Sequence, residues 1–418
     1  MIIGNSAAGT NAAETLRKLA PSSEITIISD EKETAYSRCL LSWYVDGSIE
    51  KEGLYFKTKH FYQDYEIEPL LGYRVRRIDR QNSRLLCDNG KEIAYDKLLI
   101  ATGAHPFRPP IEGINHKNVF GFHSISDAEN IINCLSGVEQ VVVVGAGFVG
   151  LETAYAVARK GAEVTVVERL PQILPNNFDY IASQIFNEDL IKENINVIIG
   201  KSLISINGDS KEVTGISLSD GTQIKCQLVV LATGVRPNSE LAIETGLNVN
   251  KGIEVDEYMR TNDQNVFSAG DVIKINDVTI GKRAPSATWY NAVIQGKYAA
   301  YNMVGQKRRY SKAVGIQSAV EFREIPAISF GTTKIDPLKQ AEYDFLSVRK
   351  GNDYRKLVIK DERLVGMVFV GDISNAGFYA KMIKNQINIS TTKEKLLKPD
   401  FTYAYFKHLD YGERNPYL

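Results

Sequence analysis

Residues 141–168, VVVVGAGFVGLETAYAVARKGAEVTVVE, constrain the fold of this chain more than any other stretch. Four consecutive valines are typical of a buried parallel strand. Three glycines follow with the spacing G-x-G-x-x-G: Gly145, Gly147 and Gly150. The Ala-rich segment 151–160 predicts a helix, and a second apolar run, 164–167, ends at Glu168. Strand, glycines, helix, strand and acid in this order predict a dinucleotide-binding unit, and a glycine turn without a ligand is the weaker alternative.

Each part of this segment has a physical role. Gly145 permits the tight turn out of the strand, Gly147 lets a pyrophosphate approach the backbone, and Gly150 lets helix and strand pack closely. The helix N-terminus offers free N–H groups and a positive dipole end to phosphates. Two residues of this turn are counted with the predicted site: Phe148 and Val149. Glu168, 18 residues after Gly150, is placed to accept hydrogen bonds from a ribose diol.

The N-terminus repeats the pattern. After the apolar residues 1–3, the turn carries a serine at the middle glycine position and contains four predicted site residues: Gly4, Ser6, Ala8 and Gly9. Segment 10–19 predicts a helix and 25–28 a strand, followed by Glu31, the preferred ribose ligand, with Asp30 as the alternative. Only three residues precede Gly4, which is short for a strand that should be central in its sheet. Two fingerprints predict two dinucleotides, one a tightly bound flavin and one an exchanging nicotinamide.

Two further segments end in the same small-residue turn. Segment 95–103 ends in Ala101, Thr102 and Gly103, and segment 228–234 ends in Ala232, Thr233 and Gly234. Prolines follow both turns, which predicts stiff crossings between domains. The sequence therefore predicts an α/β protein with two Rossmann-like domains, one inserted in the other, and a C-terminal α+β domain. The predicted limits are 1–108 and 237–312 for the flavin domain, 109–236 for the nicotinamide domain, and 313–418 for the C-terminal domain.

Segment 261–271 predicts a short strand ending in Gly270 and Asp271, and 287–303 predicts a helix with small residues on one side. With these, the order of motifs resembles that of the two-dinucleotide flavoprotein reductases, the pyridine nucleotide–disulfide oxidoreductase superfamily. Residues 36–42, YSRCLLS, are similar to the Y-x-R-x-x-L-S stretch of rubredoxin reductases and of the flavin half of NADH nitrite reductases. Residues 354–372 resemble the hairpin of the last domain of those enzymes.

This resemblance implies FAD at the first fingerprint, with Glu31 at its adenosine ribose and Asp271 at its ribityl–phosphate segment. Arg38 matches the basic residue near the isoalloxazine edge. The helix that starts near Trp289 would aim its positive end at the flavin, which stabilises the reduced ring.

The second fingerprint, with Glu168, would bind the nicotinamide dinucleotide, and Glu152 matches the family glutamate beside the nicotinamide ring. Hydride then passes from nicotinamide to flavin. Glu168 should repel a 2′-phosphate, so NADH is preferred, while the neighbouring Arg169 keeps NADPH open.

The sequence departs from the disulfide reductases because it has neither C-x-x-C nor C-x-x-x-x-C. It has the single Cys39, which is either a redox centre or a small buried residue near the flavin. The predicted catalytic set is Arg38, Cys39 and Glu152. The first hypothesis is an FAD-dependent NADH reductase that passes electrons to an iron–sulfur carrier or subunit. The alternatives are a Cys39-dependent NADH oxidase, peroxidase or coenzyme A disulfide reductase, and a non-catalytic dinucleotide-binding subunit or redox sensor.

Composition limits the remaining classes. The 418 residues are 44% hydrophobic and 24% charged, and Lys+Arg and Asp+Glu both number 50. We therefore expect a soluble globular chain without nucleic-acid or membrane partners, with the cytoplasm as the default location. The four cysteines are scattered, which argues against a metal site or a disulfide scaffold. The N-terminus looks like a strand entering a turn and not like a signal peptide.

The C-terminal region predicts a hairpin over 354–370, turning at 361–363, and one helix over 375–385. In the related enzymes this domain serves dimerisation or acceptor contact, so a homodimer through it is an expectation. Six aromatic residues in the tail 401–418 are expected to pack on the body or across a subunit interface.

Overall fold

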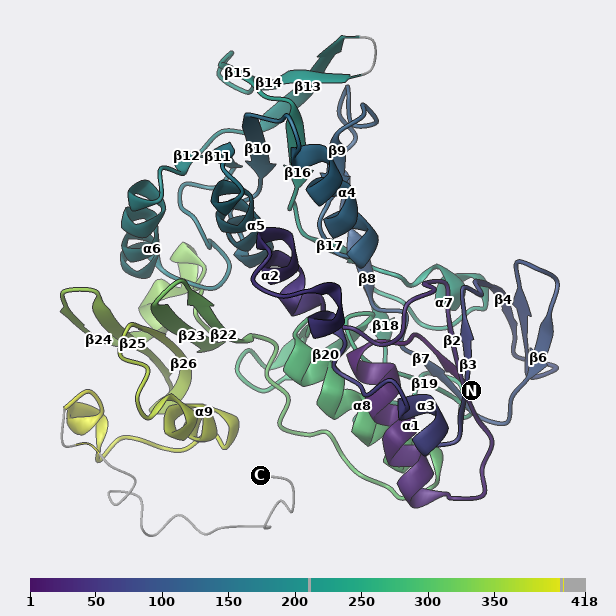
Figure 1. Ribbon diagram of the computed structural model, residues 1–418. Coiled ribbons are helices and arrows are strands. Elements are labelled where there is room, and N and C mark those ends of the chain that lie inside the picture. Colours follow the sequence, from purple (N-terminus) through teal and green to yellow (C-terminus); the bar gives the residue numbers. More distant parts are fainter. Residues whose placement is uncertain (210–211, 399–400, 402–418) are drawn as a thin grey trace.

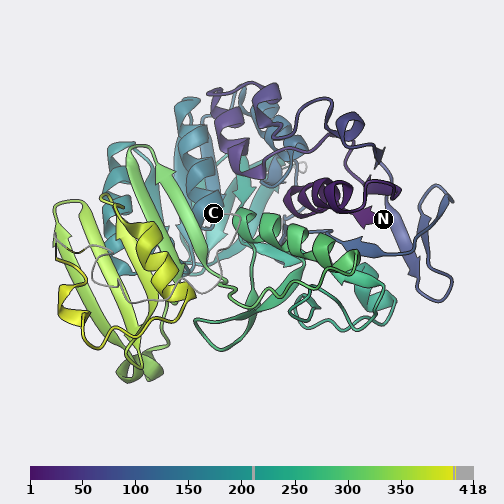
Figure 2. The same cartoon turned by 90° about the horizontal axis from the view of Figure 1, so that it is seen from below.

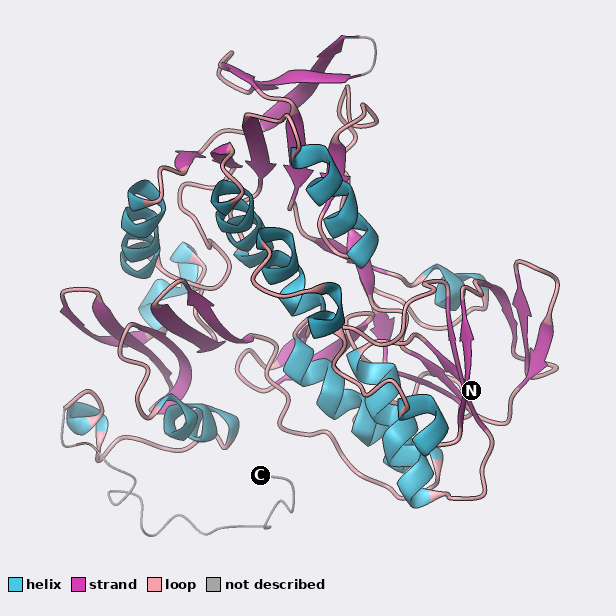
Figure 3. Ribbon diagram, in the orientation of Figure 1, coloured by secondary structure: helices cyan, strands magenta, loops and turns pink. Residues whose placement is uncertain are grey.

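The computed structural model describes residues 1–209, 212–398 and 401. Two parallel sheets with their helices lie beside each other, and an antiparallel sheet stands at one end (Figure 1). Figure 3 distinguishes the helices, strands and loops of the three units. Apart from Phe401, the aromatic tail 401–418 lies outside the described residues.

The first sheet is parallel, and its strand order is β19-β7-β1-β2-β3. Its strands are β1 (Ile2–Ile3), β2 (Ile25–Ser29), β3 (Ile67–Leu71), β7 (Leu98–Ile100) and β19 (Val266–Ser268). The two-residue β1 is central, as expected for the short run before Gly4.

Two helices of the first unit, α1 (Ala7–Leu19) and α8 (Trp289–Met303), lie side by side (Figures 1 and 2). They approach so closely that a Cβ at Gly296 would meet the Ala8 carbonyl oxygen at 2.2 Å. The small residues along 287–303 therefore serve this helix contact, which brings the start of α8 close to the first fingerprint.

The second sheet is also parallel and has the order β12-β11-β10-β16-β9. Its strands are β9 (Val119–Gly121), β10 (Gln140–Val144), β11 (Glu163–Glu168), β12 (Asn196–Ile199) and β16 (Leu228–Leu231). Its helices are α4 (Ile125–Leu135), α5 (Phe148–Arg159) and α6 (Tyr180–Lys192). Because these strands fall between β7 and β19 in sequence, the second unit is inserted into the first, and the predicted fold class is confirmed.

The predicted helix 151–160 begins three residues earlier, at Phe148. Gly147 is the N-cap and has an extended backbone, so the helix starts immediately after the glycine turn.

The C-terminal sheet is antiparallel, with the order β22-β23-β26-β25-β24. Its strands are β22 (Gln317–Phe322), β23 (Ile325–Gly331), β24 (Asp344–Lys350), β25 (Asp353–Lys360) and β26 (Arg363–Val370). Helix α9 (Ala376–Lys384) covers one face, and the other face shares a hydrophobic core with the second unit. The predicted hairpin and helix are therefore present, and the hairpin turns at Asp361 and Glu362, both at positive φ.

The remaining elements lie outside these three sheets. The strands are β4 (Val75–Asp79), β5 (Arg84–Cys87), β6 (Glu92–Ala94), β8 (Ala104–Pro106), β13 (Leu203–Asp209), β14 (Glu212–Leu218), β15 (Gln223–Lys225), β17 (Val235–Pro237), β18 (Ile253–Glu254), β20 (Ile273–Asp277) and β21 (Lys282–Pro285). Short helices are α2 (Leu41–Asp46), α3 (Phe61–Asp64), α7 (Glu240–Glu244) and the 3-10 helices at Arg38–Leu40, Lys51–Leu54, Pro337–Glu342 and Lys393–Lys395.

Strands β8 and β17 pair with each other, so the two proline-rich crossings between the units lie side by side. The domain limits at residues 108/109, 236/237 and 312/313 stay predictions. Across the described part of the chain, every helix is too short or too polar to cross a bilayer.

Candidate active site

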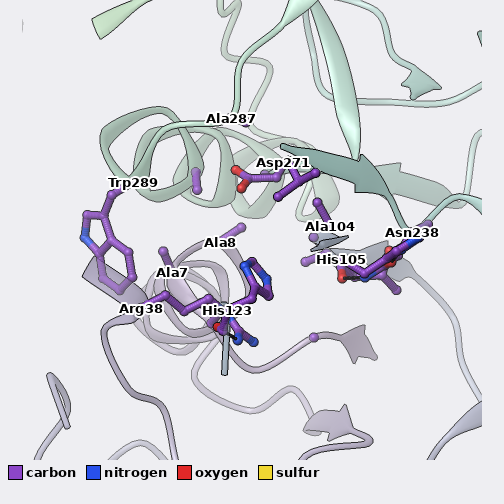
Figure 4. Close-up of a pocket in the computed structure, with 18 of the residues that line it drawn as sticks. Ala7, Ala8, Arg38, Ala104, His105, His123, Asn238, Asp271, Ala287 and Trp289 are labelled. Carbon is purple, nitrogen blue, oxygen red and sulfur yellow. Dashed lines mark hydrogen bonds between the residues drawn. The ribbon is translucent and has the colours of Figure 1, made fainter. Parts of the chain in front are cut away.

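A cavity of about 1250 Å³ lies where the two fingerprints and β22 meet. It exceeds the roughly 300–1,000 Å³ of common small-molecule sites, as a site for two extended ligands requires. Figure 4 shows part of its lining, including Arg38, Asp271 and Trp289. The predicted site residues that line the cavity are Gly4, Ser6, Ala8, Glu31, Arg38, Cys39, Ala101, Thr102, Gly103, Gly147, Phe148, Val149, Glu152, Ala232, Gly234, Gly270, Asp271 and Trp289.

Five predicted site residues do not line this cavity: Gly9, Gly145, Gly150, Glu168 and Thr233. The glycines among them let neighbouring backbone segments approach closely. A Cβ at Gly9 would lie 1.9 Å from the Gly4 carbonyl oxygen, and one at Gly150 would lie 1.9 Å from that of Gly145. Gly145 itself has a φ of +106° and abuts the Ala232 carbonyl. These residues therefore allow helix, turn and strand to pack closely.

Gly147 differs from these glycines. It lines the cavity, and a Cβ built there would have nothing within 4 Å. The space in front of its backbone is therefore open, which is the cradle that a pyrophosphate needs. Helix α5 begins at the next residue, so its free N–H groups point toward the same space.

Glu168 is buried, and both of its carboxylate oxygens accept backbone hydrogen bonds. The donors are the N–H groups of Ala146 and Leu170, each at 2.8 Å. The carboxylate therefore holds the fingerprint turn in place. It retains lone pairs for a ribose diol, so the predicted ribose contact stays a prediction.

Glu31 and Arg38 form one polar network inside the cavity. Glu31 accepts a hydrogen bond from the Tyr36 hydroxyl at 2.6 Å and pairs with the Arg38 guanidinium. Arg38 also donates to the Tyr36 hydroxyl at 2.8 Å and to the His123 carbonyl at 2.6 Å. These contacts hold the cation in one position. Asp30, the alternative ribose ligand, also lines the cavity and is exposed.

Asp271 enters the cavity from the first unit, opposite Arg38 and His123 (Figure 4). Burial raises its pKa to about 6, and Arg38 opposes that rise. The preceding residue, Gly270, has a φ of +87° and donates its N–H to the Gln295 side chain at 2.8 Å. Helix α8 starts at Trp289 beside this loop and is capped by Thr288, so its positive end faces the cavity.

Glu152 lies on α5 and lines the cavity with Cys39. Burial raises its pKa to about 7. Within the described residues, the carboxylates of Glu152 and Asp271 make no hydrogen bond or ion pair. Two carboxylates without protein partners in one cavity fit ligands that bring their own hydrogen-bond donors.

Cys39 lines the cavity and is exposed to it. Both interpretations of this residue, a redox centre and a small residue buried near the flavin, stay predictions. The cavity is recessed, and burial, followed by the charge of Glu152, raises the pKa of the thiol. At neutral pH the residue is therefore a thiol and not a thiolate.

Over the described residues, no group of three or more His, Cys, Asp and Glu side chains could hold a metal ion.

Two histidines that the sequence did not place in the predicted site also line the cavity. His123 lies beside Arg38, and burial, with Arg38 adding to it, lowers the pKa of its imidazole to about 4 (Figure 4). His105 contacts Asn238, with 2.5 Å between Nδ1 and Oδ1. His123 follows β9, and ligand-binding residues gather at the carboxyl ends of parallel strands, which is the signal that could have found it.

The turns after β7 and β16 are fixed from outside the two sheets. Thr102 donates its hydroxyl to the Asn238 carbonyl at 2.8 Å, and Asn238 donates back to the Thr102 carbonyl at 2.7 Å. Thr233 likewise donates to the Phe107 carbonyl at 2.6 Å. Each threonine thus ties one crossing segment to the other.

Comparison with known proteins identifies the family. Residues 1–296 match the family described as pyridine nucleotide-disulphide oxidoreductase, and residues 321–387 match the rubredoxin NAD+ reductase C-terminal domain. The chain belongs to the pyridine nucleotide-disulphide oxidoreductase family. The resemblance stated from the sequence motifs is therefore confirmed, including its C-terminal part.

Three proteins illustrate the similarity. The NADH oxidase of Methanocaldococcus jannaschii is 38% identical over 319 residues, which are 74% of this chain and 71% of that protein. The assimilatory nitrate reductase electron transfer subunit of Bacillus subtilis is 28% identical over 99% of this chain, and the chain spans 52% of its length. The structure of an NAD-dependent persulfide reductase from A. fulgidus matches with a TM-score of 0.87 and 28% identity, over 96% of this chain and 79% of that one.

FAD and a nicotinamide dinucleotide are the cofactors of this family, and the residues of the cavity fit both. Two glycine fingerprints open onto one cavity, helices α1, α5 and α8 begin at it, and the carboxylates of Glu152 and Asp271 in it have free acceptor oxygens.

Proposed function

We propose that this protein is an FAD-dependent NAD(P)H oxidoreductase that passes electrons to an iron–sulfur carrier or partner subunit. The observation that carries the proposal is a single cavity shared by both fingerprints, in a chain without a dithiol motif. When bound there, the flavin accepts hydride from the nicotinamide and can release electrons singly. The chain spans 52% of the length of the Bacillus subtilis relative, so the identity of the acceptor is part of this proposal.

In this scheme the residues of the chain bind and orient the two dinucleotides. The turn of Gly4 and Ser6 and the start of α1 hold the flavin pyrophosphate, and Asp271 accepts from the ribityl segment. Glu31 or Asp30 binds the adenosine ribose. Arg38 is held by Glu31 and the His123 carbonyl, so it presents a fixed positive charge to the ring system.

The second fingerprint binds the nicotinamide dinucleotide through Gly147, Phe148 and Val149, with Glu152 beside the nicotinamide. Glu168 disfavours a 2′-phosphate by like-charge repulsion, so NADH is the preferred donor. Arg169 directly follows and is exposed, which keeps NADPH open as a second donor.

The acceptor proposal rests on the C-terminal domain and on relatives. This domain matches that of rubredoxin NAD+ reductase, and one relative is named an electron transfer subunit.

We also propose cytoplasmic location and a homodimer through residues 313–418.

An anaerobic NADH titration of the purified flavoprotein, followed by the visible absorbance of the flavin, tests the proposal. About one NADH per flavin should bleach the flavin fully, because the flavin is then the only redox centre. Reoxidation by rubredoxin or ferredoxin should follow. A flavin that NADH reduces only slowly, in a protein recovered in tight complexes, would support the binding-subunit or redox-sensor alternative instead.

A second function is favoured by the exposure of Cys39 in the cavity beside Glu152. Relatives named NADH oxidase and persulfide reductase support it. In that case Cys39 would serve an oxidase, a peroxidase or a coenzyme A disulfide reductase. The titration would then need about two NADH per flavin, and Cys39→Ser would abolish turnover.

A further inference from the structure

Strand β22 of the C-terminal domain touches both walls of the cavity. Residues 317–320 line the cavity directly. At its start, Gln317 donates from Nε2 to Asn291 Oδ1 on α8 at 2.6 Å. At its end, Phe322 reaches into the second unit. The strand therefore bridges the flavin half and the nicotinamide half of the site.

Phe322 is 2% exposed and lies in an aromatic cluster that belongs otherwise to the second unit. Its ring centroid is 5.3 Å from that of Phe186, in an edge-on arrangement, and 6.1 Å from that of Tyr155. Such rings bury large apolar areas and prefer these geometries. The C-terminal domain thus supplies one ring to the core of the nicotinamide-binding unit.

Phe148 connects this cluster to the cavity. It is the first residue of α5, directly after the Gly147 cradle, and it lines the cavity. Its ring stacks on Phe322 at a centroid distance of 6.2 Å and an interplanar angle of 25°. The edge of Phe178 supports it from a second direction, at 6.0 Å and 89°. One side of the Phe148 ring therefore rests on a residue of another domain.

Polar contacts fix the C-terminal sheet in this position. Asp179, the N-cap of α6, accepts from the Tyr354 hydroxyl at 2.7 Å and from Lys356 Nζ at 2.8 Å. Arg323, directly after Phe322, pairs with Glu193 at 2.6 Å. The sheet cannot shift along α6 without breaking these contacts.

We infer that Phe322 is a positioning residue for the nicotinamide dinucleotide, because it holds the Phe148 ring against the cavity wall. The C-terminal domain thereby completes the nicotinamide site. This inference rests on the proposed function, in which the second fingerprint binds that dinucleotide. Residues 317–320 and Phe322 belong to one strand, so a partner that displaces the C-terminal sheet would also alter nicotinamide binding.

The test measures NAD+ binding to the oxidised holoenzyme by calorimetry, for wild type, Phe322→Leu and Phe369→Leu. Phe369 is the matched control, because it is buried in the same sheet but packs on Tyr379 of α9, on the opposite face. Phe322→Leu should raise the Kd for NAD+ by roughly three- to tenfold, which is the effect expected from losing its pair with Phe148, the ring that lines the cavity. Phe369→Leu should lower the melting temperature comparably and leave the Kd unchanged.

A double-mutant cycle with Phe148→Leu shows whether Phe322 acts through Phe148. If it does, Phe322→Leu should have no further effect on the Kd once Phe148 is leucine. Equal Kd values for Phe322→Leu and wild type would overturn the inference, as would equal weakening by both phenylalanine variants. If the wild-type protein does not bind NAD+, the proposed function fails. The inference about Phe322 fails separately, when the wild-type protein binds NAD+ and the variants show no difference that runs through Phe148. Should Phe322→Leu not fold, the same comparison is made with Arg323→Met, which removes the ion pair that fixes the end of β22 to Glu193 and should also weaken NAD+ binding, by less than Phe322→Leu.

Discussion

Gln295 should be required both for stability and for FAD retention, and Gln295→Leu tests this. The side chain is fully buried. Its Oε1 accepts from the Gly270 N–H at 2.8 Å, and its Nε2 donates to the Ser286 hydroxyl at 2.7 Å. Leucine has similar size and neither polar group, so the substitution removes these bonds, and the contact with Tyr310, without leaving a large void.

The expected cost follows from the unpaired donor. A buried N–H without an acceptor costs about 1–3 kcal/mol, and the lost bond to Ser286 adds about 1 kcal/mol. The free energy of unfolding should therefore fall by about 2–4 kcal/mol. For a folding unit of about 150–250 residues, each kcal/mol shifts Tm by about 2–4 °C. Gly270 precedes Asp271, so the same change should loosen the loop that carries this carboxylate and lower FAD content.

The assay compares Tm and FAD content per chain for wild type, Gln295→Leu and Gln63→Leu. Gln63 is the control because it is an exposed glutamine on α3. We expect a fall in Tm of at least about 4 °C for Gln295→Leu and little change for Gln63→Leu. If Gln295→Leu keeps the Tm and FAD content of wild type, the reasoning that Gln295 holds the Gly270–Asp271 loop is refuted.

Three further changes follow from the same structure. Gly147→Ala places a Cβ in open cavity space, so Tm should change little while the Kd for NAD+ rises at least about tenfold; calorimetry checks this, and unchanged binding would contradict the cradle. Burial raises the pKa of Glu152 from 4.5 to about 7, so the folded state favours the neutral carboxyl group. The stability that this group contributes is therefore complete below about pH 4.5 and is lost as the pH rises through 7. Glu152→Gln should remove this loss, which Tm measured from pH 5 to 8 reports, and parallel pH profiles for the two proteins would contradict it. Under the first function, Cys39→Ser should retain NADH-dependent reduction of an iron–sulfur carrier, with about one NADH per flavin in the titration; loss of turnover would favour the cysteine-dependent function.

The sequence alone could predict the fold class and the two fingerprints because their determinants are local. A turn that needs positive φ, such as that at Gly4 or Gly145, can be recognised from the glycine itself and from the apolar run before it. The structure places each fingerprint beside its own Ala-Thr-Gly turn. Gly4 abuts the carbonyl of Ala101, and Gly145 abuts that of Ala232, because the two strands are neighbours in each sheet.

Residue roles inside the cavity were less accessible to sequence reasoning. Arg38 and His123 are 85 positions apart and meet because Arg38 donates to the His123 carbonyl. No spacing rule reports such a contact. The exposure of Cys39 is likewise set by the walls around it, which come from both dinucleotide units and from β22.

By itself, the sequence determined that this chain builds two dinucleotide units and a C-terminal α+β domain, since glycine spacing and hydrophobic periodicity act over a few residues. Three features were decided only by the tertiary structure. The Glu168 carboxylate accepts hydrogen bonds from its own turn, His123 lines the cavity, and Phe322 of another domain packs on Phe148. The physical reason is that these features depend on how surfaces far apart in the chain pack against each other, and packing is the joint outcome of all the side chains at an interface.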